Sequence, residues 1–68
     1  MKEVRTIYGF RDLQSEEEFF VEVSGSDTIR NFDRAYNFAH AVVSKYVQSL
    51  GVFTEECAKI WGWATHRI

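Results

Sequence analysis

Cys57 is the only cysteine in a chain of 68 residues, and this excludes two of the usual ways in which so short a chain is stabilised. One cysteine cannot form a disulfide within the chain, and no set of Cys and His has the spacing of a structural zinc site. A domain of this size buries only about 60% of the surface that its unfolded chain exposes. We therefore expect stability to come from dense packing of large side chains or from association with a second chain.

The composition supplies the side chains for dense packing. Six Phe, three Tyr and two Trp are present, and 46% of the residues are apolar. Each buried aromatic side chain removes on the order of 150–250 Å² of surface from water, and a disordered chain would lack this apolar content. We expect one folded domain over residues 1–68.

Neither an export signal nor a membrane span is predicted. The segment Met1–Arg11 mixes charged and apolar residues singly, whereas a secretory signal needs an uninterrupted apolar run of about 7–15 residues. We expect the chain to stay in the cytoplasm. The formal charge of −2 is also too small and of the wrong sign for a typical nucleic-acid-binding domain.

The first third of the chain has the alternating pattern of two β-strands. Glu3–Phe10 and Glu17–Ser24 are rich in strand-forming residues at a period of two, and the polar segment Arg11–Glu16 between them can turn. The second strand places Phe19, Val21 and Val23 on one face and Phe20 and Glu22 on the other. A hairpin followed by a loop at Ser24–Asp27 is predicted.

The middle of the chain has the spacing of an amphipathic helix. With Asn31 as the N-cap, the segment Phe32–Leu50 gathers its apolar residues in one arc of about 140°. Gly51 follows at the position where a helix often ends. The members of the arc are Phe32, Ala35, Tyr36, Ala39, Val42, Val43, Tyr46, Val47 and Leu50.

The tail can be interpreted in two ways. Thr54 followed by two glutamates is typical of a helix start, and the apolar residues after it cluster within about 100° of arc: Cys57, Ile60, Trp61, Ala64 and Ile68. The alternative is a strand over Lys59–Thr65, favoured by its β-branched and aromatic residues.

The predicted fold is a small two-layer α+β domain, with an N-terminal β-hairpin packed on a long amphipathic helix and a short C-terminal helix. The alternative fold is ββαβ with a C-terminal strand.

No catalytic set is present, so we expect neither an enzyme nor a cofactor or metal site. His40 and His66 have no Cys, Asp or Glu three or four residues further along the chain that would complete a ligand pair. Cys57 belongs to the apolar arc of the tail, which indicates a core residue rather than a nucleophile.

A weak resemblance to the DNA-binding helix-turn-helix lies around Gly51. The apolar and glycine positions of that motif match Tyr46, Leu50, Gly51, Val52, Cys57 and Ile60. The helix that would enter the major groove begins with Thr54, Glu55 and Glu56, and these acids would be repelled by phosphate. A nucleic-acid-binding regulator is therefore the alternative function.

Three large aromatic residues fall outside the predicted core faces: Phe20, Phe38 and Trp63. Exposed aromatic side chains beside charges are typical of protein interfaces. We therefore predict a protein-binding module, with a homodimer as one possible form, in which these three side chains make the contacts. The charged residues at the rim would be Arg34, Lys45, Glu16, Glu17 and Glu18. The competing interpretation is that the tail helix covers the second sheet face and buries Phe20 and Trp63.

In size, aromatic content and mild acidity the chain is similar in general character to phage-encoded inhibitors of host machinery, including anti-CRISPR proteins. The likeness is one of size and composition and includes no motif. It implies an inhibitor that acts by binding a protein of the host.

Overall fold

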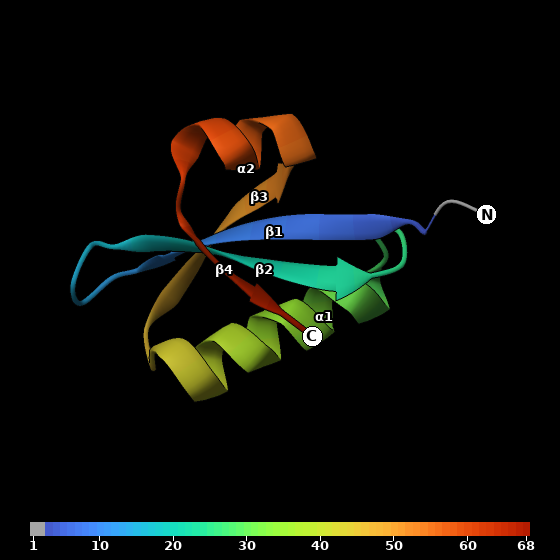
Figure 1. The fold of residues 1–68 in the computed structure, drawn as a ribbon. Helices are drawn as coiled ribbons and strands as arrows, with labels where there is room; N and C mark the ends of the chain where they lie inside the picture. The colour runs from blue at the N-terminus through green and yellow to red at the C-terminus, as the bar shows by residue number, and fades with distance from the viewer. Residues whose placement is uncertain (1–2) are drawn as a thin grey trace.

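The computed structural model describes residues 3–68 and confirms a small α+β domain with an N-terminal hairpin (Figure 1). Within this range, no helix is long and apolar enough to span a membrane. In chain order the elements are β1 (Arg5–Asp12), β2 (Glu18–Ser24), α1 (Ile29–Phe38), the π-helical segment η1 (Ala39–Val43), β3 (Val47–Phe53), α2 (Glu55–Trp61) and β4 (Ala64–Arg67).

The four strands form one mixed sheet in the order β3-β1-β2-β4. β1 is antiparallel to both β2 and β3, whereas β4 runs parallel to β2. β2, β3 and β4 therefore share one direction, and each connection between them crosses the sheet. α1 makes the first crossing on one face, and α2 makes the second in the reverse direction on the other face (Figure 1). The second crossover runs across the sheet in the opposite direction to the first and also lies on the opposite face. These two reversals cancel, so both crossovers have the same hand, as the chirality of such connections requires.

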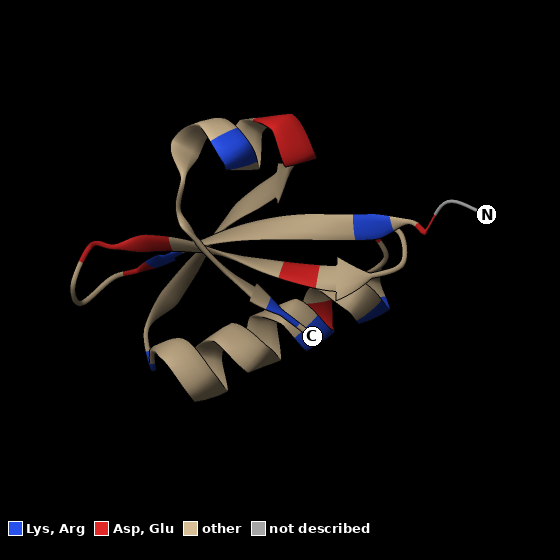
Figure 2. Ribbon diagram, viewed as in Figure 1, with Lys and Arg blue, Asp and Glu red and all other residues tan. Residues whose placement is uncertain are grey.

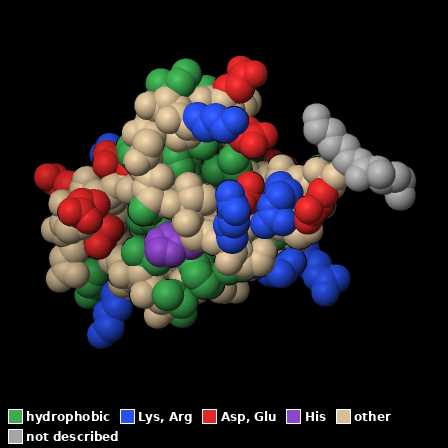
Figure 3. Space-filling view, in the orientation of Figure 1, with side chains coloured by type: hydrophobic (Ala, Val, Ile, Leu, Met, Phe, Trp, Pro, Cys, Tyr) green, Lys and Arg blue, Asp and Glu red, His purple; other side chains and the backbone are tan. Residues whose placement is uncertain are grey.

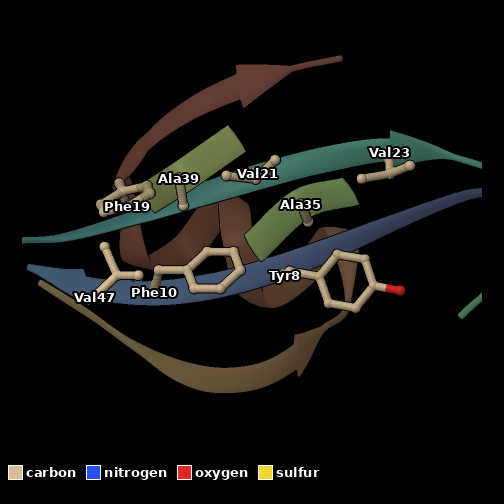
Figure 4. Packing of buried hydrophobic residues seen from close by; sticks show 8 residues of the cluster. All are labelled: Tyr8, Phe10, Phe19, Val21, Val23, Ala35, Ala39 and Val47. Carbon is tan, nitrogen blue, oxygen red and sulfur yellow. The ribbon is translucent and has the colours of Figure 1, made fainter. Parts of the chain in front are cut away.

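The main core lies between the β1-β2 hairpin and α1 (Figure 4). The predicted inward face of β2, namely Phe19, Val21 and Val23, is confirmed, since all three side chains are buried. Small side chains at Ala35 and Ala39 let the helix approach the sheet closely. The remaining buried members of the cluster are Tyr8, Phe10 and Val47.

Tyr8 is a large core residue with a polar end. Its hydroxyl donates a hydrogen bond to Asp27 Oδ1 at 2.8 Å. Burial first, and then the bond to Asp27, raise the pKa of Tyr8 to about 12. The loop before α1 is thereby tied to the centre of the sheet.

The prediction of one helix over Phe32–Leu50 is wrong at both ends. α1 begins at Ile29, and its N-cap is Thr28 rather than Asn31; the Thr28 hydroxyl accepts from the Asn31 N–H at 3.1 Å. The helical segment ends at Val43, where the Ser44 N–H donates to the Ala39 carbonyl at 3.0 Å in the i to i+5 pattern of a π-turn.

Residues 47–50 were predicted to end this helix, with Gly51 as its stop, but residues 47–53 form strand β3 instead. Val47 and Ser49 face the core side of the sheet, so a period of two was also present in this segment. Pairing with β1 satisfies backbone groups along an edge that would otherwise be open. This gain outweighs the helical preference of the local sequence.

In the tail, both interpretations hold in part. Thr54 caps α2 by accepting from the Cys57 N–H at 3.1 Å, and Gly62 ends the helix in the left-handed conformation at φ 66°. The chain then forms β4, a C-terminal strand that begins later than the Lys59–Thr65 alternative. The prediction that Cys57 is a core residue is wrong, because its side chain is exposed.

Candidate protein-binding surface

The sheet face opposite α1 carries a cluster of four aromatic rings. Phe20 lies at its base, fully buried, with Trp63 stacked on it at a centroid distance of 4.7 Å and Phe53 edge-on at 5.2 Å. Trp61 adds to the outer side, 5.0 Å from Phe53 and 4.8 Å from Trp63. We call Phe20, Phe53, Trp61 and Trp63 the aromatic cluster.

Gly9 makes room for this cluster on β1. A Cβ atom at this position would overlap the ring of Phe53, so only glycine leaves room for that ring against the strand. Gly9 pairs with Phe20 on one side and with Gly51 on the other. The backbone of β1 is thus part of the floor of the cluster.

α2 has no buried residue, and it carries large apolar side chains that are exposed to solvent. Glu55, Ala58 and Lys59 line the space between the helix and the sheet. The opposite side carries Ile60, whose side chain is 81% exposed, and Trp61, which is 50% exposed. Hydrophobic side chains are visible over α2 at the top of the molecule in Figure 3.

We call Cys57, Ile60 and Trp61 the outer face of α2. All three are exposed at the spacing of one helical face. Trp61 belongs to both the outer face and the aromatic cluster, and its ring is held between Phe53 and Trp63. The exposed apolar surface is therefore continuous with the aromatic cluster.

Beneath α2 lies an open groove of about 540 Å³ lined by the ends of β1, β2 and β3 and by the start of the helix. One of its lining residues is Glu22, whose carboxylate accepts from Arg67 Nε at 2.8 Å and lies 3.4 Å from Arg5 Nε. Ile7 and Phe53 supply the apolar lining. The Glu22 carboxylate is therefore already paired with two guanidinium groups.

The described residues provide no metal site and no catalytic pair of histidines. Within residues 3–68, no group of three or more His, Cys, Asp or Glu could hold a metal ion. His40 stacks on Tyr36 at 6.2 Å, and His66 lies between Phe19 at 5.7 Å and Phe38 at 5.9 Å. Both imidazoles therefore pack against aromatic rings.

The three aromatic residues predicted as contacts do not form one patch. The expectation that Phe20 is exposed is wrong, since it is fully buried beneath Trp63 and Phe53. Trp63 is half-buried in the same cluster, and Phe38 is half-buried on the other face of the sheet. The competing interpretation, in which the tail helix covers the second sheet face and buries Phe20 and Trp63, is right for Phe20, whereas Trp63 is only half-buried.

The charged residues predicted at the rim lie in three separate places. Arg34 is exposed on α1, and Lys45 is exposed just before β3. The acidic run Glu16–Glu18 forms the end of the hairpin, away from α2 (Figure 2). Glu18 is paired there with Arg11 at 3.1 Å. None of these charges borders the outer face of α2.

The structure does not form the helix-turn-helix that the Gly51 spacing suggested. Leu50, Gly51 and Val52 lie within strand β3, and the preceding helical segment ends at Val43. The two helices lie on opposite faces of the sheet (Figure 1). The geometry needed to present a recognition helix beside a supporting helix is therefore absent from residues 3–68.

Sequence reasoning missed Ile60 and Trp61 as surface residues because the apolar arc of the tail was assigned to the core. The signal that could have found them is the pair of aromatic residues at either end of α2, Phe53 and Trp63. Both pack on Phe20 and fill the sheet face beneath the helix. α2 therefore lies outside the layer of aromatic rings that covers this sheet face.

No protein-family model, curated protein or solved structure matches this chain.

Proposed function

We propose that this chain is a protein-binding module whose contact surface is the outer face of α2. The observation that carries the proposal is the orientation of α2, which leaves Ile60 81% exposed and Trp61 50% exposed on a helix that could have turned them inward. Full burial of an aliphatic side chain such as Ile60 contributes about 1.5–3 kcal/mol. Leaving it in solvent forgoes that stabilisation in the isolated chain, and a partner would recover it.

The aromatic cluster makes Trp61 well suited to anchor a partner. Its ring lies edge-on to both Phe53 and Trp63, so its rotamer is restricted before binding. A side chain that is already ordered loses little conformational entropy when it binds, and Trp is among the residues that contribute most at interfaces. Glu56 is exposed beside this surface and would form part of its polar rim.

The partner that fits this surface is a protein with an apolar groove, into which one face of a short helix can pack. A cytoplasmic inhibitor of host machinery, of the kind that phages encode against CRISPR systems, is the finer form of the proposal. It is supported by the small size and the aromatic composition of the chain together with this exposed helix face.

Affinity capture from cells of the source organism tests the proposal. The wild type is compared with the double variant Ile60→Ser, Trp61→Ala. The matched control is Ile29→Ser, which changes an isoleucine that is 84% exposed on α1. We expect a specific protein to be retained by the wild type and by the control and to be lost from the double variant. Equal capture by all three folded proteins would show that the outer face of α2 is not the contact surface.

A further inference from the structure

The two edges of the sheet differ in how they are protected from pairing with another strand. β4, at one edge, is a short strand that carries Arg67 and follows a half-buried Trp63. β3, at the other edge, runs over Val47–Phe53 and contains neither a charged residue nor a proline. Charges and prolines are the usual means of blocking edge pairing, so β3 is the open edge.

Exposed apolar side chains border this open edge. Tyr46, immediately before β3, is 58% exposed, and Val52 within it is 52% exposed. A strand added to β3 would bury both and would bond with its free backbone groups. β3 has a bulge at Leu50, where the register with β1 shifts between Gly9 and Phe10, and this is a protective feature of the edge.

The charges that flank β3 indicate which strand would be added. Lys45 precedes the strand, and Glu55 and Glu56 follow it at the start of α2. Neither Lys45 nor Glu56 forms a salt bridge within residues 3–68. An antiparallel copy of β3 would bring the basic flank of one chain to the acidic flank of the other at both ends, whereas a parallel copy would join like charges.

We propose that two copies of this chain pair through β3 in antiparallel orientation and form one continuous sheet. In the chain itself, Ser49 and Val52 face the α1 side, whereas Gln48 and Phe53 face the α2 side. With Ser49 opposite Val52 of the second copy, the acidic start of α2 in each chain lies toward Lys45 of the other, and Gln48 lies opposite Phe53. Every pair then keeps its side chains on one face of the sheet, as strand pairing requires.

This arrangement adds a property that a single copy lacks. The two-fold axis of an antiparallel edge-to-edge pair is perpendicular to the sheet, so both copies present the same face to the same side. The two α2 helices would therefore lie on one side of the joined sheet, and the dimer would offer two outer faces to a partner. The pairing itself does not depend on the function proposed for α2.

Sedimentation over a series of protein concentrations tests the pairing. The wild type is expected to reach twice the mass of the 8.0 kDa chain. Lys45→Glu should weaken the dimer on the order of tenfold, because two attractions between opposite charges become repulsions. Lys45→Glu combined with Glu56→Lys should restore it. The matched control is Arg34→Glu, the same charge change at an exposed position on α1.

Val52→Lys provides a second and independent variant, because it introduces a charge into the edge without touching the core. We expect this variant to be folded by circular dichroism and monomeric. A wild type that stays monomeric over the whole series would overturn the proposal, and so would a dimer that neither Lys45→Glu nor Val52→Lys weakens. Ile60→Ser separates the two proposals, since it should keep the dimer while losing the partner of α2.

Discussion

At the scale of single residues, Gly9 carries the strictest requirement. Its missing side chain lets the Phe53 ring lie on β1, and a methyl group there would overlap that ring. We expect Gly9→Ala to lower the free energy of unfolding by about 1–3 kcal/mol, the usual cost of forcing an extra methyl group into a packed site. Chemical denaturation of the variant and the wild type measures this loss.

The background Phe53→Leu supplies the control for this prediction. Removing the ring should relieve the overlap, so Gly9→Ala should cost clearly less in that background than in the wild type. An equal cost in both backgrounds would mean that the alanine acts through the strand itself rather than through Phe53.

At the scale of elements, Asp12 joins the hairpin to the end of η1. Its Oδ1 accepts from the Gln14 N–H at 2.9 Å and from the Ser44 hydroxyl at 2.8 Å. These bonds, with the Gln14 N–H as the largest cause, hold the pKa of Asp12 below its ordinary value of 3.8. A lowered folded-state pKa means that the charged form stabilises the fold above pH 3.8, and that this stabilisation is lost as the pH falls below it.

We therefore expect Asp12→Asn to be less stable than the wild type at neutral pH and to approach it in acid. The measurement is the free energy of unfolding of both proteins between neutral pH and acid. Asp33→Asn, which changes an exposed aspartate on α1, is the matched control. A difference between Asp12→Asn and the wild type that does not change with pH would contradict the proposed role of the charge.

Elements whose pattern is local could be predicted from the sequence. The alternation of Phe19, Val21 and Val23 identified β2 and its inward face, and Thr54 marked the start of α2. The end of the long helix could not be found in this way. A π-turn at Ala39–Val43 changes the number of residues per turn, so a projection at 100° per residue loses its phase there and places the 63% exposed Val42 in the core.

The choice between helix and strand for residues 47–53 also lay outside local reasoning. Val47 fits the apolar arc of a helix and equally the inward side of a strand. Whether residues 47–53 form a helix or a strand depends on pairing with β1, which is distant in the sequence. Periodicity describes one segment at a time, whereas the secondary structure of residues 47–53 is determined by their pairing with β1.

At the scale of the whole molecule, the two faces of the sheet are covered by different parts of the chain. α1 covers one face with small and aromatic side chains, whereas the aromatic cluster covers much of the other and leaves α2 on its outside. A chain with no disulfide thus forms two apolar layers and still leaves Ile60 and Trp61 exposed to solvent. This surplus, rather than the three residues singled out by periodicity, is the basis for expecting a partner.

The most direct test of this account is the free energy of unfolding of Ile60→Ser, measured by chemical denaturation beside Val21→Ala as a core reference. Because α2 turns Ile60 outward, we expect its substitution to change stability by no more than about 0.5 kcal/mol, whereas truncation of the fully buried Val21 should cost about 2 kcal/mol or more. A loss at Ile60 as large as that at Val21 would place Ile60 in the core, and the binding surface proposed on α2 would not exist.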